Sequence, residues 1–367
     1  MNAQQQLPKA YTGYNPLAEA MRQGTRLMNA YAAWLDLSEK DIEIATLEKK
    51  EVMRMGHISL YRYTPLVEKK HDTPVLVVYS QIGRFTMLDL QPDRSLLRNL
   101  LNEGYEVYLI DWGHPGRAER WMTFEDYVED CIGSSVDFMC DACDVDKISL
   151  LGICEGGVFS TCYAALHPER IKALALTVTP IDFHADLDAP AEDMQGQISR
   201  WVQKMSEEDI DAYGHLPGEI TGLFFLAMTP IKSLTKYNWD LPNALSGKRE
   251  DVINFFRMEK WLADRPDHPG EAGRQWLMNL YQRNELVKGE FMIGENRVDL
   301  TRLSMPVLNV MALQDHIVPP PTSRPLRNFV PEENYEELEF DVGHIGTFVS
   351  KRACRALSDK LADFLAD

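Results

Sequence analysis

The sequence predicts an α/β fold built on a doubly wound, mostly parallel β-sheet. Short and fully apolar runs, typical of strands that are buried on both faces, recur along the chain. Helical patterns separate consecutive runs, which indicates parallel strands joined by crossover helices. The length of 367 residues and the 45% hydrophobic content are those of an ordinary globular protein with a large core.

The predicted elements follow one another from the N-terminus. After an amphipathic stretch over residues 16–37, the alternating segments EVMRM and HISLYRY, joined by Gly56, predict an antiparallel hairpin at a sheet edge. An amphipathic helix over residues 351–365 ends the chain. Between them lie the predicted parallel strands PVLVVYS, YEVYLID, KISLLG, IKALALTVT, PVLNVMA and YEELEF.

Between residues 181 and 303 this alternation stops, and helical, aromatic-rich segments such as LFFLAM and QWLMNLYQ take its place. We interpret residues 181–303 as a helical cap or lid inserted into the sheet domain. The catalytic core then comprises residues 1–180, including an N-terminal helical stretch over residues 1–40, together with residues 304–367.

Charge and cysteine content exclude several classes of function. The formal net charge of −18 disfavours nucleic acid or anionic lipid as a partner. The N-terminus resembles no secretion signal and no apolar run approaches the ~20 residues of a membrane span, so we expect a cytoplasmic enzyme. Six scattered cysteines suit reduced thiols, and the C-x-x-C pair of Cys140 and Cys143 lacks further ligands, so we expect no metal.

A candidate nucleophile lies between the strand KISLLG and the helical run VFSTCYAALH, in the segment GICEGG. A strand, a sharp turn and a helix form a nucleophile elbow, here with Cys154 in place of serine. Glycines allow the strained turn, and the helix N-terminus favours a thiolate. The alternative for Cys154 is a small buried packing residue, which is what we expect of Cys131 and Cys162.

Two further residues follow in the order nucleophile, acid, base that the α/β-hydrolase fold requires. Asp315 comes after the strand PVLNVMA, and His344 comes after the strand YEELEF. Alone, Asp315 could be a turn or helix-cap residue and His344 a loop histidine. Their joint placement favours a Cys154–His344–Asp315 triad, with His316 in a supporting position rather than as the base.

An oxyanion hole in this fold uses two backbone N–H groups. The first belongs to the residue after the nucleophile, which is Glu155. The second comes from the loop after the strand PVLVVYS, where Ile82 or Gly83 is the best candidate.

These motifs resemble those of the catalytic subunit of two-component, class III polyhydroxyalkanoate synthases, with the class IV type second. The sequence departs from the family pattern at Glu155, where an uncharged residue is common, and in the loop Gln81-Ile82-Gly83-Arg84-Phe85, where the family usually has Asn before the basic residue. The resemblance runs nearly end to end and rests on the segments MLDLQPDRSLLRNLL, YLIDWGHPGRAERWMTFEDYV, GICEGG, FRMEKWLADRPDHPGE, ALQDHIVPP and GHIG.

The resemblance implies an acyltransferase that polymerises (R)-3-hydroxyacyl-CoA, in particular short-chain 3-hydroxybutyryl-CoA, through a thioester on Cys154. Coenzyme A is part of the substrate, so no cofactor is implied. The implied partners are the growing polyester chain and a second, smaller synthase subunit, in a homodimer or hetero-oligomer at the surface of polyester granules. The resemblance leaves open whether Asp315 orients His344 or helps to deprotonate the monomer hydroxyl.

Two other functions are compatible with the fold, because a fold alone does not fix a function. One is a hydrolase with a Cys-Asp-His triad that acts on a thioester or a lactone. The other is a noncatalytic granule scaffold. Release of free hydroxyacid would favour the hydrolase, and absence of CoA release would favour the scaffold.

Overall fold

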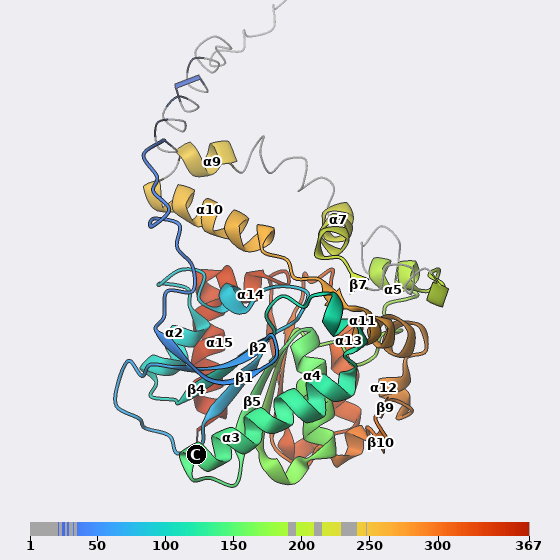
Figure 1. Ribbon diagram of the computed structural model, residues 1–367. Helices are drawn as coiled ribbons and strands as arrows, with labels where there is room; N and C mark the ends of the chain where they lie inside the picture. The colour runs from blue at the N-terminus through green and yellow to red at the C-terminus, as the bar shows by residue number, and fades with distance from the viewer. Residues whose placement is uncertain are drawn as a thin grey trace, which may run out of the picture. The chain divides into compact units, whose positions relative to one another are not determined.

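The computed structural model of the chain describes residues 35–189, 196–208, 215–228, 241–246 and 248–366, together with Met21, Gly24, Thr25, Met28 and Ala32. Its main feature is an eight-stranded β-sheet with the strand order β1-β2-β4-β3-β5-β6-β11-β12 (Figure 1). Strands β4, β3, β5, β6, β11 and β12 run parallel, whereas β1 and β2 join the sheet through antiparallel pairs. This confirms the predicted α/β fold.

The predicted hairpin at the sheet edge is formed by β1 and β2, and Gly56 in its turn has a φ of 61°. Each predicted parallel strand is also present. The strands of the sheet are β1 (Lys49–Met55), β2 (Ile58–Tyr63), β3 (Val75–Val78), β4 (Val107–Asp111), β5 (Ile148–Ile153), β6 (Ile171–Thr177), β11 (Val307–Ala312) and β12 (Tyr335–Phe340). Two short pairs join β7 (His215–Leu216) to β8 (His268–Pro269), and β9 (Met292–Ile293) to β10 (Asn296–Arg297).

The predicted C-terminal helix is α15, and the predicted amphipathic stretch over residues 16–37 lies largely outside the described residues. The α-helices are α2 (Leu96–Asn102), α3 (Ser134–Cys143), α4 (Glu155–Leu166), α5 (Gln197–Val202), α7 (Gly218–Met228), α9 (Leu241–Ser246), α10 (Arg249–Ala263), α11 (Gly270–Gln275), α12 (Glu285–Lys288), α13 (Pro320–Ser323), α14 (Gly346–Val349) and α15 (Lys351–Phe364). Shorter 3₁₀ or π turns are η1 (Phe85–Leu88), η2 (Arg117–Trp121), η3 (Asp126–Gly133), η4 (Pro168–Arg170), η7 (Trp276–Gln282), η8 (Leu300–Arg302), η9 (Arg324–Asn328) and η10 (Glu332–Asn334).

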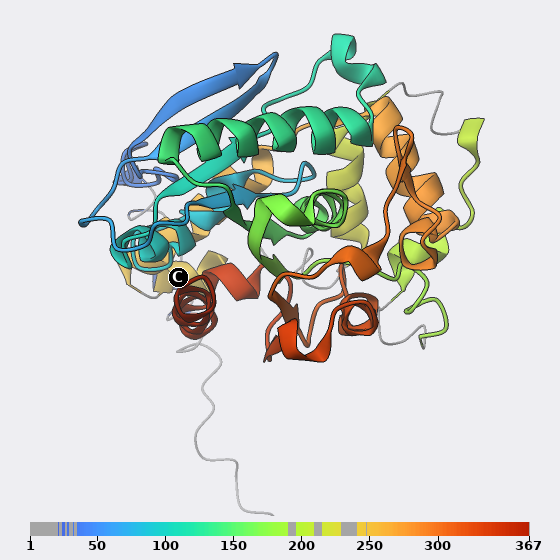
Figure 2. The same cartoon turned by 90° about the horizontal axis from the view of Figure 1, so that it is seen from below.

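Helices cover both faces of the sheet, so side chains on both faces of its central strands are buried. This explains why the sequences of these strands are continuous apolar runs. In β3, Val75 and Val77 pack with α2 and α15 on one face. Leu76 and Val78 pack with η3, α3 and α4 on the other. Figures 1 and 2 show these two helical layers with the sheet between them. The alternation of side chains along each strand therefore builds two cores.

The chain divides into two compact units, residues 1–43 with 230–257 and residues 44–229 with 258–367. The second unit holds the whole eight-stranded sheet. The helical cap over residues 181–303 stays a prediction. No described helix has both the length and the apolar character that crossing a bilayer requires.

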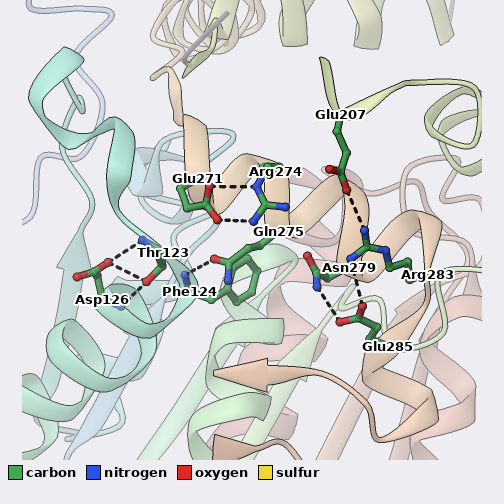
Figure 3. Close-up of polar contacts among 10 residues, drawn as sticks. All are labelled: Thr123, Phe124, Asp126, Glu207, Glu271, Arg274, Gln275, Asn279, Arg283 and Glu285. Carbon is green, nitrogen blue, oxygen red and sulfur yellow. Dashed lines mark hydrogen bonds and ion pairs between the residues drawn. The ribbon is translucent and has the colours of Figure 1, made fainter. Parts of the chain in front are cut away.

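Helix α11 is fixed to the segment that follows η2. The Ala272 N–H donates to the Met122 carbonyl oxygen at 2.9 Å, and the Phe124 N–H donates to Gln275 Oε1 at 2.8 Å. Figure 3 shows the Phe124–Gln275 bond beside the Glu271–Arg274 ion pair within α11 and the contacts that Arg283 makes with Glu207 and Glu285. These bonds hold α11 in place. They therefore also restrict the position of His268, which lies two residues before the helix begins.

Candidate active site

Cys154 forms the turn between β5 and α4. Its backbone has φ 56° and ψ −123°, which is strained for a residue that carries a side chain. Two hydrogen bonds hold this conformation: Cys154 N–H donates to the Thr177 carbonyl oxygen at 2.9 Å, and Gly157 N–H donates to the Cys154 carbonyl oxygen at 2.9 Å. The segment therefore has the geometry of a nucleophile elbow.

Two glycines of the elbow allow backbone segments to approach closely. A Cβ added to Gly156 would lie 2.5 Å from the Tyr79 carbonyl oxygen at the end of β3. A Cβ added to Gly152 would lie 2.6 Å from the Gly157 Cα atom. Both distances are shorter than van der Waals contact, so the elbow accepts no side chain at either position.

We expect Gly156→Ala to lower the free energy of unfolding by about 1–3 kcal/mol or more, because its Cβ meets backbone atoms of β3 that have little freedom to move. Gly133→Ala is the matched control, since its added Cβ would lie 3.6 Å from the Tyr163 ring in ordinary contact. Urea unfolding measures both variants. Equal stability of the two variants would contradict the close approach at Gly156.

Asp315 and His344 lie together beyond the C-terminal ends of β11 and β12. The two residues form a bond of 2.6 Å between His344 Nδ1 and Asp315 Oδ2. Asp315 is fully buried, and its Oδ1 accepts the N–H groups of Ile317 at 2.8 Å and Val318 at 2.9 Å. Because both carboxylate oxygens accept bonds, Asp315 fixes the tautomer in which Nδ1 of His344 carries a proton.

Cys154 and His344 lie at the same edge of the sheet, because Cys154 follows β5 and His344 follows β12. Burial disfavours the imidazolium, but the charges of Asp315 and Cys154 outweigh it and hold the pKa of His344 well above its ordinary value. The structure thus brings together the three residues Cys154, His344 and Asp315. Such an arrangement can activate a thiol and carry its proton.

The loop after β3 lies beside the start of α4. Ile82 N–H donates to Ser80 Oγ at 3.1 Å, and Gln81 N–H donates to Glu155 Oε2 at 2.9 Å. Gly83 lies against the ring of Trp261. The loop is therefore close to the backbone of Glu155, and its assignment as part of an oxyanion hole stays a prediction.

The sequence alone did not predict that His268 lies beside the nucleophile elbow. Its Nε2 lies 2.5 Å from Glu155 Oε1, and both side chains are buried. Burial disfavours the His268 imidazolium, yet the Glu155 carboxylate raises the pKa of His268 above its ordinary value. The sequence did contain an indication of this pair: Glu155 is the only charged residue of α4, and a buried carboxylate needs a partner.

Tyr281 belongs to η7, within the predicted cap. Burial raises the pKa of Tyr281 well above its ordinary value, and the negative charges of Cys154, Asp186, Glu155 and Asp315 add to this effect. The Tyr281 ring packs against Phe183, with 4.8 Å between the ring centroids.

Comparisons with known proteins identify relatives over most of the chain. A family model described as poly-beta-hydroxybutyrate polymerase (PhaC) N-terminus matches residues 11–100, and one for the alpha/beta hydrolase fold matches residues 74–350. The poly(3-hydroxyalkanoate) polymerase subunit PhaC of Synechocystis sp. is 42% identical over 90% of this chain and 87% of its own length. The PhaC subunit of Thiocystis violacea is 38% identical over 90% of this chain and 91% of its own length.

Solved structures agree on the fold. A putative lipase from Sulfolobus solfataricus has a TM-score of 0.56 at 15% identity and covers 86% of this chain and 92% of its own. A putative non-heme bromoperoxidase, BpoC, from Mycobacterium tuberculosis has a TM-score of 0.52 at 17% identity and covers 86% and 97%. At this low identity, the solved structures show only that the chain has the α/β-hydrolase fold, whereas the sequence relatives identify the family. The chain belongs to the PhaC family of poly(3-hydroxyalkanoate) polymerases.

Proposed function

We propose that this protein is an acyltransferase that polymerises (R)-3-hydroxyacyl-CoA into a polyester with release of CoA. One observation carries the proposal: a Cys154–His344–Asp315 arrangement occurs in a chain whose relatives are named poly(3-hydroxyalkanoate) polymerase. A cysteine suits this reaction, because transfer of an acyl group from one thiol to another is nearly isoenergetic and keeps the group activated.

The first step loads the enzyme. His344 accepts the proton of Cys154, and the thiolate attacks the carbonyl carbon of the CoA thioester. The resulting oxyanion is stabilised by the backbone N–H of Glu155 and by that of Ile82, which stays directed by Ser80 Oγ and shares its hydrogen with the oxyanion. The C–S bond to CoA then breaks, the CoA thiolate takes the proton from His344, and the acyl group stays on Cys154.

The second step extends the chain. His344 removes the proton from the hydroxyl of the next monomer, and the oxygen attacks the Cys154 thioester to form an ester bond. The C–S bond to Cys154 breaks, and the thiolate recovers the proton from His344. The lengthened chain is now a CoA thioester, and it reloads Cys154 by the first step with release of CoA. Asp315 orients His344 in both steps, because its carboxylate is buried and already accepts three hydrogen bonds. Water must be kept away from the thioester, which is the role we assign to the predicted cap.

The finer features also belong to this proposal. The monomer is short-chain 3-hydroxybutyryl-CoA, and no cofactor beyond the CoA of the substrate takes part. A second, smaller subunit of the PhaE type supports full activity, in a homodimer or hetero-oligomer. The enzyme works in the cytoplasm at the surface of polyester granules, as the class III resemblance suggests.

A turnover experiment tests the proposed function. We expect the chain to release CoA from (R)-3-hydroxybutyryl-CoA and to form an insoluble polyester of equal molar amount, with higher activity when a PhaE-type subunit is supplied. CoA is measured with a thiol reagent, and the pelleted product is hydrolysed and quantified. Release of CoA with only soluble 3-hydroxybutyrate would identify a hydrolase instead. No CoA release in the presence of the second subunit would favour a noncatalytic scaffold.

A further inference from the structure

The carboxylate of Glu155 lies at the junction of three segments that surround Cys154. Glu155 is the first residue of α4 and is fully buried. Its Oε2 accepts the Gln81 N–H at 2.9 Å and the Ser80 hydroxyl at 3.2 Å, both from the loop after β3. Its Oε1 is bound to His268 at 2.5 Å. One side chain therefore joins the elbow to the loop of the proposed oxyanion hole and to the start of α11.

A buried carboxylate in this position requires compensation. Taking an ionised carboxylate out of water is costly unless a counter-charge and hydrogen bonds replace the solvent. His268 Nε2 lies 2.5 Å from Glu155 Oε1, where an imidazolium would supply the counter-charge, and the Glu155 carboxylate raises the pKa of the imidazole against the effect of burial. Ser80 and Gln81 provide the hydrogen bonds. Both carboxylate oxygens of Glu155 thus have partners, which replace the water that the buried side chain has lost.

His268 is held as firmly as Glu155. The residue is 3% exposed, and a Cβ added to Gly273 would lie 3.1 Å from its Nδ1, so the imidazole ring packs against that glycine. The helix that follows is anchored through Ala272 to the Met122 carbonyl. Gln275 of the same helix accepts the Phe124 N–H, as Figure 3 shows. The position of the imidazole is therefore set by the core and not by a free loop.

A chain of hydrogen bonds leads from this pair to the predicted second oxyanion donor. The Ser80 hydroxyl donates to Glu155 Oε2 and in turn accepts the Ile82 N–H at 3.1 Å. The backbone N–H of Glu155 is the predicted first donor. Glu155 thus contributes its own N–H on one side and sets the direction of the Ile82 N–H, through Ser80, on the other.

We propose that the buried Glu155–His268 pair is a positioning device that sets the spacing between the two backbone donors of the oxyanion hole. It is separate from the triad, and neither side chain needs to touch the substrate. The proposal rests on the proposed function, because an oxyanion forms only if Cys154 attacks a thioester. It predicts that the two residues act as a unit, so that their substitutions are not additive.

The test is a double-mutant cycle with Glu155→Gln, His268→Gln and the double variant. His268→Gln leaves a buried carboxylate without a counter-charge, whereas the double variant places two neutral amides that hydrogen-bond to each other. We expect His268→Gln to lower kcat for CoA release by about 10- to 100-fold with KM within about threefold, because only transition-state stabilisation is lost. The double variant should recover to within about threefold of Glu155→Gln.

Ser80→Ala provides a second variant in case His268→Gln does not fold, because it removes the link between Glu155 and Ile82 without leaving a charge. We expect a lower kcat and a nearly unchanged KM. Ser135→Ala is the matched control. Ser135 is also buried, but its hydroxyl donates to the carbonyl of Cys131, four residues earlier in the same helical segment. Equal kcat in Ser80→Ala and Ser135→Ala would overturn the proposal.

The wild-type protein in the same assay separates this proposal from the proposed function. Wild type that forms no polyester and releases no CoA would contradict the proposed function itself. Active wild type with additive losses in the cycle would contradict only the Glu155–His268 unit. Active wild type with recovery in the double variant would support both.

Discussion

Replacing Cys154 with alanine is expected to lower CoA release by about 10⁴-fold or more, which is the loss typical when the nucleophile of a triad is removed. The variant should also form no covalent adduct with the acyl group. Wild type, quenched after one turnover and digested, should carry the acyl mass on the peptide that contains Cys154. The strained backbone at this position already exists with a cysteine side chain, so alanine fits the same turn.

Cys143→Ala is the matched control for that experiment. Cys143 is partly exposed at the C-terminal end of α3, and the chain then enters β5 at the end opposite Cys154. Its removal should leave the rate of CoA release within about twofold of wild type. Turnover that survives in Cys154→Ala, or an acyl mass on another peptide, would refute Cys154 as the nucleophile.

The meeting of Asp315 with His344 was predictable because the carboxyl ends of parallel strands lie at one edge of the sheet. Cys154, Asp315 and His344 each follow a strand whose apolar run can be read from the sequence, and the structure brings Asp315 and His344 to 2.6 Å from each other. The glycines of GICEGG likewise indicate a turn that is tightly packed. These signals are local, so a single sequence carries them.

The Glu155–His268 pair was not predictable in the same way. The two residues are 113 positions apart, and His268 belongs to a region whose helical pattern gives no strand register. The bond from Ile82 to Ser80 depends on side-chain rotamers in a loop, which composition and periodicity do not determine. The buried carboxyl group of Glu155 requires a partner, but only the folded chain shows which residue supplies it.

Asp315→Asn is expected to lower both acylation and chain extension by about 10⁴-fold, because the amide no longer fixes the tautomer of His344. The pKa of His344 should also fall. In the native protein, burial lowers the pKa of His344, and the charges of Asp315 and Cys154 raise it by more. Without the Asp315 carboxylate, less remains to oppose the effect of burial. NMR titration of His344 measures this change, and the direction is fixed: the imidazole should lose its proton at lower pH in the variant than in wild type.

The same variant decides between the two roles of Asp315. If Asp315 acted only on the hydroxyl of the incoming monomer, Asp315→Asn would still release one equivalent of CoA rapidly and then stop. If it orients His344, that first release is slowed as much as later turnovers, since the same imidazole takes the proton of Cys154. The carboxylate is fully buried, with Oδ1 bound to two backbone N–H groups and Oδ2 to His344, so neither oxygen is exposed to a substrate. We therefore expect no burst of CoA from Asp315→Asn in a rapid-quench experiment, and a full burst would assign Asp315 to the extension step.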